Sequence, residues 1–308
     1  MSEILVLGSL NADLVVTATR APQGGETVAG ERFEVFHGGK GANQAFAAAR
    51  LGGAVSMLGR VGQDEYGVAL REGLRSVGVD VERVRCIEKT GTGVAAITVD
   101  GDGQNRIVVV PGANGAYTSG ELERDRDAFS AARFALFQLE TPLETVAEGL
   151  RRARQGGCVT ILDPAPARAL DDSMLSLVDY LTPNQSELRA LLGRSQEESP
   201  PMDEVIAMAR SLIARGVGKV VVKLGEAGAC LVGADLVVRR QARSVRVVDT
   251  TAAGDCFNAA FAVALSRGQD EAAALRFACD AASLSVTRHG AQASMPTFEE
   301  ASGFSISS

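Results

Sequence analysis

Short apolar runs alternate with longer amphipathic segments along most of the chain. The apolar runs occupy residues 4–7, 55–58, 134–139, 159–162 and 219–223. Such runs are typical of strands that are buried on both faces of a parallel sheet. Residues 44–51 and 65–77 carry apolar side chains at helical spacing. Repeated strand–helix units predict an α/β fold, with a three-layer, doubly wound and mostly parallel sheet.

Two parts of the chain have strands without an intervening helix, at about residues 13–37 and 91–110. We expect these insertions to form a small separate sheet that acts as a lid within one domain of residues 1–308. We expect its strands to carry Val15, Val28, Phe33 and Val35 as apolar residues at outward-facing positions. Because an exposed apolar sheet face needs covering, we expect a homodimer through the lid sheet.

Polar side chains follow several of the predicted strands. Asn11 and Asp13 come after the first strand, Glu140 after the strand at 134–139, and Asp163 after the strand at 159–162. In a parallel sheet the carboxyl ends of the strands share one edge, where ligands bind. These groups are therefore candidates for one site, although a simple Asx turn also explains Asn11 and Asp13.

A glycine-rich loop, His37-Gly38-Gly39-Lys40-Gly41-Ala42-Asn43, precedes the alanine-rich helix. Its glycines suit either a hinge or a close approach of backbone to a ligand. The loop is not a Walker A motif, because Gly and Ala follow Lys40 where Ser or Thr is required. Lys40 and Asn43 can donate hydrogen bonds to hydroxyl groups. A flexible loop followed by a helix cap remains the alternative.

The segment 245–265 carries the strongest candidate for chemistry. A β-branched run at 245–248 predicts a strand, and the small residues 252–254 open a helix. The free N–H groups at a helix start bind anions, phosphate above all. Asp255 adds a carboxylate in the first turn, which suits phosphoryl transfer to a hydroxyl. The alternative is that Asp255 only complements the helix dipole and that the small residues permit close packing.

Two further helix starts have capping patterns. Thr141 and Glu144 form a predicted capping box with Pro142 at the first helical position. Asn184, with Glu187 three residues later, is also a common helix cap, and the local pattern favours that interpretation over a ligand site.

The composition of the chain argues against several classes of function. The net charge of −7 and the pI near 5.1 argue against a nucleic-acid surface. Five widely spaced cysteines without a C-x-x-C pair suggest reduced thiols in a cytoplasmic protein. With two histidines, a histidine-rich metal centre is not expected. No apolar stretch is long enough for a membrane span. Gly8-Ser9-Leu10-Asn11 lacks the glycine fingerprint of a Rossmann oxidoreductase.

In order, these segments resemble the ribokinase/fructokinase group of ATP-dependent carbohydrate kinases over essentially the whole chain. The matching motifs are GSLNADLV, GGKGANQA, VGQDEYG, PGAN, QLETPLE, TPNQSE, DTTAAGDCFNAA and SVTRHGAQASMP. The PGAN, QLETPLE and TRHGAQ motifs resemble the ribose kinases of the group more than the fructose or adenosine kinases. The resemblance implies transfer of phosphate from ATP to the 5-hydroxyl of D-ribose, with Mg²⁺ required and K⁺ activating.

The resemblance also implies roles for individual residues. Asp255 would take the proton from the sugar hydroxyl, and Ala253 and Gly254 would donate N–H groups to the phosphoryl group. The residues that would hold the sugar are Asn11, Asp13, Gly39, Lys40, Gly41, Ala42, Asn43 and Glu140. The residues that would bind the nucleotide and its magnesium are Asn184, Glu187, Lys223, Leu224, Gly225, Glu226, Ala227, Gly228, Gly254 and Cys279. The residues that would surround potassium are Asp249, Thr251, Ser285, Arg288, Gly290 and Ser294.

Cys279 departs from the family pattern, which usually has Asn or His against the adenine, and this affects the expected nucleotide preference. Three alternatives to a ribose kinase remain at this point. They are a kinase for deoxyribose, fructose or a nucleoside, a non-catalytic sugar or nucleotide sensor, and an NAD-binding oxidoreductase.

Overall fold

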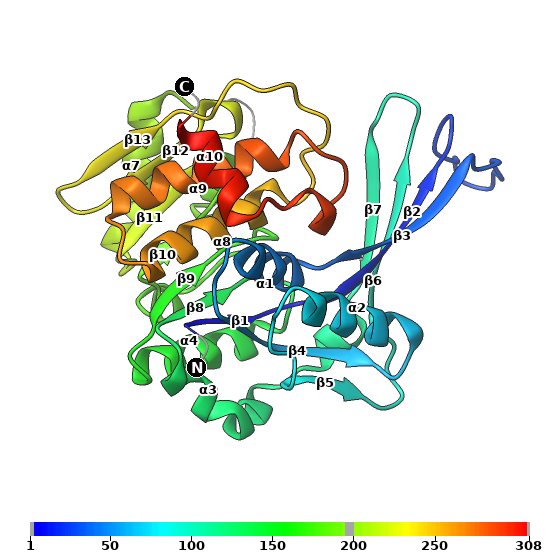
Figure 1. Cartoon of the computed structure of the whole chain (residues 1–308), viewed down its shortest axis with the longest axis horizontal. Coiled ribbons are helices and arrows are strands. Elements are labelled where there is room, and N and C mark those ends of the chain that lie inside the picture. The colour runs from blue at the N-terminus through cyan, green and yellow to red at the C-terminus, as the bar shows by residue number, and fades with distance from the viewer. Residues whose placement is uncertain (1–2, 195–199, 307–308) are drawn as a thin grey trace.

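The computed structural model describes residues 3–194 and 200–306, so both ends of the expected domain and residues 195–199 lie outside it. Its centre is a nine-stranded sheet in the order β13-β12-β11-β10-β9-β8-β1-β4-β5 (Figure 1). The strands are β1 (Ile4–Leu7), β4 (Val55–Gly62), β5 (Val84–Ile87), β8 (Phe134–Phe137), β9 (Val159–Leu162), β10 (Tyr180–Leu181), β11 (Lys219–Lys223), β12 (Ala229–Val232) and β13 (Val237–Arg240). Its pairs are parallel except β11–β12 and β12–β13.

Helices cover both faces of this sheet. One layer contains α1 (Lys40–Arg50), α2 (Glu65–Ser76), α8 (Ala253–Ser266), α9 (Glu271–Ser285) and α10 (Phe298–Ile306). The other contains α3 (Arg126–Ala131), α4 (Leu143–Gln155), α5 (Asp172–Leu175), α6 (Gln185–Leu191) and α7 (Met202–Ala214). Along β1, Ile4 and Val6 pack into the first layer, whereas Leu5 and Leu7 pack into the second. The predicted three-layer, doubly wound α/β fold is confirmed.

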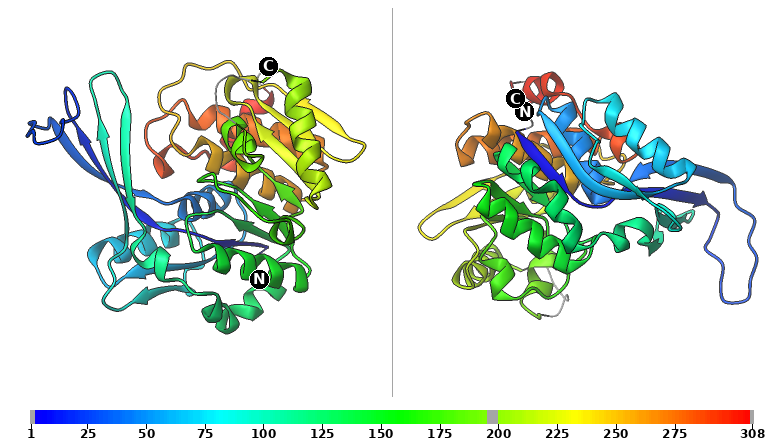
Figure 2. Two further views of the ribbon diagram at one scale, coloured as in Figure 1. Left: turned by 180° about the vertical axis from the view of Figure 1, so that it is seen from behind. Right: turned by 90° about the horizontal axis from the view of Figure 1, so that it is seen from below.

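A second, four-stranded sheet extends to one side of this core (Figures 1 and 2). Its strands are β3 (Arg32–Gly38), β2 (Asn11–Thr17), β6 (Gly93–Val99) and β7 (Asn105–Val110), in that order. We call it the lid sheet. Phe33 and Val35 are exposed on it, as are residues 107–110 of β7. The expectation that Val15 and Val28 share their outer face was wrong. Val15 pairs with Glu34 and therefore lies, half-buried, on the opposite face, whereas Val28 precedes β3 and lies outside the lid strands. The lid sheet therefore carries apolar surface that is open to solvent in this chain.

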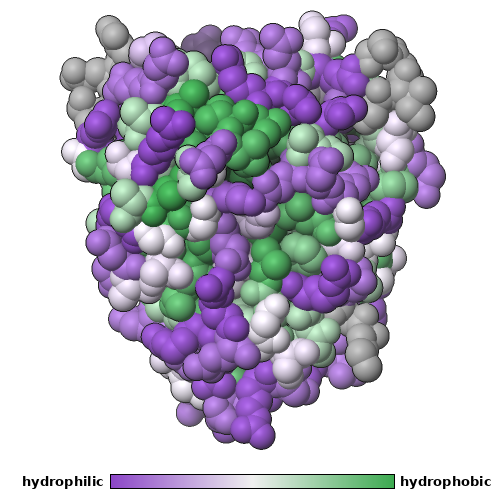
Figure 3. Space-filling view, turned by 90° about the vertical axis from the view of Figure 1, so that its left-hand side faces the viewer, coloured by the Kyte–Doolittle hydropathy of each residue, from purple (hydrophilic) through white to green (hydrophobic). Residues whose placement is uncertain are grey.

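The surface around the central sheet carries both apolar and charged side chains. Figure 3 shows the face at the β13 edge of the central sheet, where a patch of apolar side chains lies among charged ones. No helix in the described residues is both long and apolar enough to cross a bilayer. All five cysteines are free thiols; Cys86 is exposed and the other four are buried.

Some predicted elements were wrong. Residues 245–248 form no strand, because no strand of the described residues lies beside them for pairing. Val247 and Val248 are exposed, and the Val248 N–H donates to the Val286 carbonyl at 2.8 Å. The capping box at Thr141 is absent, because Pro142 itself occupies the N-cap and α4 starts at Leu143. The alanine-rich helix begins at Lys40, four residues before the predicted start.

Candidate active site

The site lies where the carboxyl ends of β1, β8, β9 and β11 meet the starts of α1 and α8. The polar residues that follow these strands in the chain converge there, as the strand exits predicted. Two helix starts face the same region but differ in one respect. The first N–H groups of α1 are already bonded to protein, whereas two N–H groups of α8 are open, with no acceptor among the described residues.

Ser9 and Glu140 close the start of α1. Glu140 Oε2 accepts from the Lys40 backbone N–H at 3.0 Å and from Ser9 Oγ at 2.5 Å. Ser9 accepts from the next two amides of the helix, Gly41 N–H at Oγ (3.4 Å) and Ala42 N–H at its carbonyl (2.9 Å). A Cβ on Gly41 would lie 2.6 Å from the Gly8 carbonyl carbon. Gly41 and Ala42 thus pack α1 against the end of β1, with no amide left open to a ligand.

Asn11 and Asp13 lie on β2, at the base of the lid sheet. Asn114 holds Asn11 in place: its Nδ2 donates to Asn11 Oδ1 at 2.8 Å and to the Leu10 carbonyl at 2.9 Å. Burial, then the nearby charges of Glu140 and Asp255, raise the pKa of Asp13 to about 7. The Asx-turn alternative for Asn11 and Asp13 is wrong, because both residues belong to a paired strand.

The glycines beside Asp13 permit this arrangement. A Cβ on Gly38 would lie 2.1 Å from Asp13 Oδ2. Gly39 is the N-cap of α1 with φ 87°, a conformation that favours glycine. A Cβ there would also lie 2.7 Å from the Asn11 backbone nitrogen. The glycine pair therefore allows the lid strands to pass close to the core at the polar site.

Asp255 is buried, with 5% of its surface exposed, and both carboxylate oxygens accept hydrogen bonds. Asn43 Nδ2 donates to Oδ2 at 3.1 Å, and Gln44 Nε2 donates to Oδ1 at 3.1 Å. Burial raises the pKa of Asp255 to about 6, with a contribution from the charge of Asp163, although Lys40 and the two hydrogen bonds act in the opposite direction. Asp255 is therefore a carboxylate that is ionised at neutral pH but more basic than an ordinary Asp.

Lys40 lies among several acidic groups. Burial alone would lower the pKa of its ammonium group, but the charges of Asp255, Asp163, Glu140 and Glu187 outweigh burial and raise that pKa above its ordinary value. Lys40 therefore carries its charge throughout the working pH range and partly balances the carboxylates.

Three residues that join this site together, Gln44, Asp163 and Gln292, had no role predicted from the sequence. Gln44 Nε2 also donates to Asp163 Oδ2 at 3.1 Å, and Lys223 Nζ pairs with Asp163 Oδ1 at 2.9 Å. Gln292 Nε2 donates to Asn43 Oδ1 at 3.3 Å. Asp163 was marked only by its position after a strand, and nothing in the spacing of Gln44 or Gln292 distinguishes them from other polar residues on helices.

The start of α8 is open. Ala252, the N-cap, has φ 59°, and the Ala253 N–H donates to the Thr250 carbonyl at 3.2 Å. In the described structure the N–H groups of Gly254 and Asp255 have no acceptor. The open anion-binding amides are therefore those of Gly254 and Asp255, and a contribution from Ala253 would require its bond to Thr250 to open.

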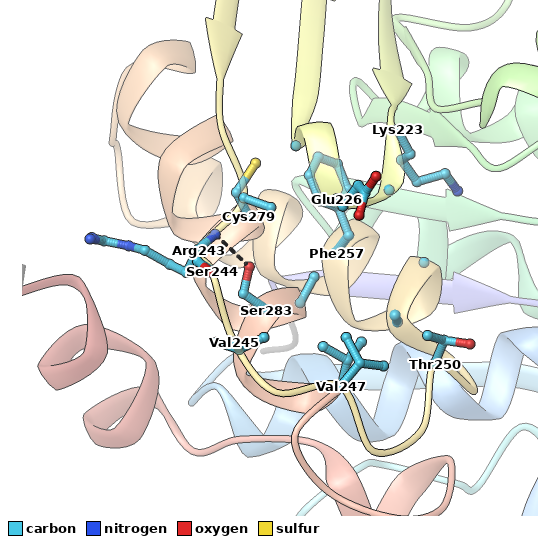
Figure 4. A pocket seen from close by; sticks show the side chains of 17 residues that line it. Lys223, Glu226, Arg243, Ser244, Val245, Val247, Thr250, Phe257, Cys279 and Ser283 are labelled. Atoms are coloured by element: carbon cyan, nitrogen blue, oxygen red, sulfur yellow. Dashed lines mark hydrogen bonds between the residues drawn. The ribbon is translucent and has the colours of Figure 1, made fainter. Parts of the chain in front are cut away.

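A cavity of about 690 Å³ adjoins the open start of α8 (Figure 4). Its walls include the apolar side chains of Val245, Val247, Phe257 and Val286. Of the predicted nucleotide residues, those lining it are Lys223, Gly225, Glu226, Gly228, Gly254 and Cys279, whereas Asn184, Glu187, Leu224 and Ala227 do not. Burial raises the pKa of the Cys279 thiol to about 12, so this group is neutral.

Asn184 and Glu187 form the helix cap that their spacing predicted. Asn184 Oδ1 accepts from the Glu187 N–H at 2.8 Å, and Glu187 Oε2 accepts from the Asn184 N–H at 2.7 Å. Asn184 also forms an isolated parallel bridge with Lys223, so the cap lies beside the exit of β11. Burial raises the pKa of Glu187, with the charge of Lys223 opposing and that of Asp163 adding to the rise.

The residues assigned to potassium lie in two neighbouring segments. Asp249 Oδ2 accepts from the Gly290 N–H at 2.9 Å, and its Oδ1 accepts from the N–H (2.9 Å) and hydroxyl (2.6 Å) of Thr251. Ser285 lies at the end of α9 and Ser294 in the short helix Gln292–Ser294. The Arg288 guanidinium pairs with Glu300. Among the described residues no group of three His, Cys, Asp or Glu side chains could hold a metal ion.

Comparison with known proteins agrees with this arrangement. The pfkB family carbohydrate kinase model matches residues 1–298. A ribokinase of Schizosaccharomyces pombe is 42% identical over 315 residues, 98% of each chain. A deoxyribokinase of Salmonella typhi is 36% identical over 299 residues, 97% of each chain. The structure of Arabidopsis thaliana ribokinase complexed with ribose and ATP has a TM-score of 0.94 at 33% identity, covering 100% of this chain and 99% of that one.

These similarities extend over almost the whole chain, including both sheets and the segments that form the site. The chain belongs to the pfkB family of carbohydrate kinases.

Proposed function

We propose that this chain transfers the γ-phosphoryl group of ATP to the 5-hydroxyl of D-ribose, giving ribose 5-phosphate and ADP. One observation carries the proposal: the buried Asp255 carboxylate lies next to open N–H groups, between the polar residues at the base of the lid sheet and the cavity at α8. Phosphoryl transfer needs a base and an anion site that lie between the pockets for the two substrates. The curated ribokinases among its relatives support the choice of ribose.

Ribose would bind at the base of the lid sheet. Its hydroxyl groups would donate to the carboxylates of Asp13 and Glu140 and to Asn11 Oδ1, while the amide of Asn43 and the ammonium of Lys40 would donate to its oxygens. Gly39 would contribute backbone at close approach. The lid sheet would limit access of water to this pocket, which favours transfer to the sugar over hydrolysis of ATP.

Asp255 would act as the general base. Its carboxylate accepts the proton of the 5-hydroxyl as the new oxygen–phosphorus bond forms and the bond from the γ-phosphorus to the bridging oxygen of ADP breaks. The N–H groups of Gly254 and of Asp255 itself would donate to the oxygens of the transferring group, where negative charge is concentrated. A pKa of about 6 leaves Asp255 ionised at pH 7 and above and makes it a better proton acceptor than an ordinary Asp.

The nucleotide would occupy the 690 Å³ cavity, with its base against the apolar wall and its phosphates toward Lys223 and Gly254. Glu187 fits a role near Mg²⁺, because burial and the nearby charge of Asp163 raise its pKa, and a dication relieves such repulsion. Mg²⁺ commonly keeps several waters beside one or two carboxylates. Bound there, the ion would neutralise phosphate charge.

K⁺ would be held by the segments around Asp249 and Gly290. These segments fit K⁺ because they offer oxygen atoms, the ligands that hard cations prefer. The oxygens come from the carboxylate of Asp249, the hydroxyls of Thr251, Ser285 and Ser294, and the backbone carbonyls of both segments. Arg288 would contribute only through its carbonyl, because its side chain pairs with Glu300. A bound cation would join the segment before α8 to the end of α9.

Deoxyribose is the second candidate acceptor, and the deoxyribokinase at 36% identity favours it over fructose or adenosine. A site that hydrogen-bonds the 2-hydroxyl of ribose discriminates against the deoxy sugar, because polar groups would be left unpaired. Membership of a carbohydrate kinase family is inconsistent with the oxidoreductase alternative. A non-catalytic sensor would bind ribose and ATP without releasing ADP.

The direct test is a coupled ADP-release assay with ribose, deoxyribose, fructose and adenosine, each with and without Mg²⁺ and K⁺. We expect ribose to have the highest kcat/KM, no turnover without Mg²⁺, and faster turnover with K⁺. A higher kcat/KM for another acceptor would replace ribose as the substrate. Ribose binding without ADP release under every condition would support the sensor.

Assembly and compartment are part of the proposal. The exposed apolar residues of the lid sheet suit a homodimer formed through that sheet, which would bury Phe33, Val35 and the β7 residues of both copies. A cytoplasmic location is consistent with five free thiols and with a function that consumes ATP.

A further inference from the structure

Gln44 bridges two buried carboxylates that lie on different sides of the candidate site. Its side-chain NH₂ has two protons, and its nitrogen lies 3.1 Å from Asp255 Oδ1 and 3.1 Å from Asp163 Oδ2. Gln44, Asp255 and Asp163 are all buried, with 1%, 5% and 2% of their surfaces exposed. Two carboxylates that share one amide donor in a dry environment depend on that donor, because it offsets their mutual repulsion.

Gln138 determines which way the Gln44 amide faces. Gln138 Nε2 donates to Gln44 Oε1 at 2.7 Å, so the Gln44 oxygen is held on the side away from the two carboxylates. Gln138 is itself fully buried at the end of β8, and a Cβ on Gly8 would collide with its Oε1 at 2.0 Å. The Gln44 amide therefore has all its main hydrogen-bonding positions occupied and only one useful orientation.

The chain of contacts continues from Asp163 to the phosphate side of the site. Asp163 Oδ1 accepts from Lys223 Nζ at 2.9 Å, and Lys223 lines the cavity (Figure 4). A Cβ placed on Gly254 would lie 3.5 Å from Lys223 Nζ, so this ammonium lies beside the open N–H groups of α8. A cation at that position can interact with a phosphoryl group bound to those amides.

We propose that Gln44 is a positioning residue that holds the Asp255 base and, through Asp163, the Lys223 ammonium in a fixed relation across the site of phosphoryl transfer. Gln44 contacts neither substrate in this role. It keeps the base directed at the acceptor hydroxyl and the cation directed at the phosphoryl group, two groups that come from residues 32 positions apart in the chain. The role presupposes the proposed phosphoryl transfer, and it adds a residue that links its two halves.

Loss of the amide would have two effects. Asp255 and Asp163 would repel each other without a shared donor, so Asp255 and the Lys223–Asp163 pair would move apart; a displacement of about 1 Å in a reacting group can cost about 100-fold in rate. Asp255 would also lose a hydrogen bond that favours its charged form, so its pKa would rise from about 6. Turnover would then require a higher pH.

The test compares wild-type protein with Gln44→Met, which keeps the length of the side chain but has no donor, and Gln44→Glu, which replaces the donor by a third acid. Thr145→Val is the matched control, because Thr145 is also buried and its hydroxyl donates to the Tyr117 carbonyl at 2.5 Å outside the site. Ribose 5-phosphate formation, ribose KM and the pH profile of kcat/KM are measured for each, together with Tm.

We expect Gln44→Met to lower kcat about 100-fold with ribose KM changed less than about threefold. The acid limb of kcat/KM should move to higher pH by about one unit, and further in Gln44→Glu. Thr145→Val should lower Tm without moving that limb. An unmoved limb or a kcat within about twofold of wild type, in a Gln44 variant that remains folded, would overturn the role. Absence of ribose 5-phosphate with the wild-type protein would instead overturn the proposed function.

A double-mutant cycle with Lys223→Met tests the link to the phosphate side. If Gln44 acts on Lys223 through Asp163, the double variant should lose about tenfold less activity than the product of the two single losses. Losses that multiply in full would show that Gln44 acts on Asp255 alone and would overturn the proposed connection across the site. Tm values of all three variants show whether each one is folded. If Lys223→Met does not fold, Lys223→Gln takes its place in the cycle, because an amide removes the charge but still offers Asp163 a donor.

Discussion

Replacing Gly254 by alanine adds one methyl group at the open start of α8. Among the described residues beyond its own helix and chain neighbours, a Cβ at this position comes within 4 Å of Lys223 alone, with Nζ at 3.5 Å and Cδ at 4.0 Å, which are ordinary contact distances. The residue is helical, so alanine is compatible with its backbone. The substitution therefore changes the anion site and little else.

The expected effects on stability and activity have opposite signs. Alanine in place of a helical glycine stabilises the folded chain by about 0.5–1 kcal/mol, which raises Tm by about 1–3 °C for a protein of this size. The methyl group, however, occupies space beside the open N–H groups, where the phosphoryl group would bind. A displacement of that group by about 1 Å would lower kcat by about 100-fold.

Gly41→Ala at the closed start of α1 is the contrasting variant. Its Cβ would lie 2.6 Å from the Gly8 carbonyl carbon and 2.6 Å from the Ser9 nitrogen, both backbone atoms. Such overpacking should destabilise the protein by about 1–3 kcal/mol and lower its Tm. Differential scanning calorimetry and the ADP-release assay measure both properties. Full activity in Gly254→Ala at unchanged or raised Tm would refute a phosphoryl site at the start of α8.

Three further predictions concern pH, the nucleotide and assembly. Because burial and the neighbouring acids raise the pKa of Asp13 from 3.8 to about 7, protonated Asp13 stabilises the fold at low pH and this contribution is lost as pH rises from about 4 through 7. The free energy of unfolding of Asp13→Asn, measured by urea titration, should therefore rise relative to that of the wild type as pH increases over this interval. A difference that stays constant with pH would contradict the raised pKa. Cys279→Asn should lower the KM for ATP about 2–10-fold in steady-state assays, because the amide adds one hydrogen bond to the nucleotide base. An unchanged or higher KM would count against contact between the base and Cys279. Phe33→Asp, on the exposed face of the lid sheet, should convert a dimer to a monomer in analytical ultracentrifugation without lowering Tm; a wild-type protein that sediments as a monomer at micromolar concentration would exclude the lid dimer.

The central strands were predictable because strands that are buried on both faces consist of short apolar runs. Ile4–Leu7, Val159–Leu162 and Lys219–Lys223 have the bounds that those runs predicted. The run at 245–248 has a similar β-branched composition but no neighbouring strand among the described residues, and its Val245 and Val247 line a cavity instead. The composition of a segment indicates its preference for the strand conformation, whereas strand pairing depends on which other segments of the folded chain lie next to it.

In the candidate site, too, the sequence predicted some of the residues but not the contacts between them. Asp255 and Asn43 were singled out from their positions at helix starts, but their contact at 3.1 Å joins residues 212 positions apart and could not be read from spacing. Gln44 and Gln292 carry no local signal, since a polar residue on a helix is usually solvated. Likewise, only the structure reveals that the amides of Gly41 and Ala42 are already bonded to Ser9. Which helix start remains open is a property of the packed molecule.

The measurement that most directly tests proton transfer to Asp255 is the turnover of Asp255→Asn with ribose and ATP, beside ribose binding by calorimetry. Loss of a general base should lower kcat by about 1,000-fold, or about 4 kcal/mol, and should abolish the acid limb near pH 6 that the wild-type protein is expected to show. Ribose affinity should change less than about tenfold, because Asn11, Asp13 and Glu140 remain. Near-normal turnover by a folded Asp255→Asn protein would contradict the role of Asp255 as the base.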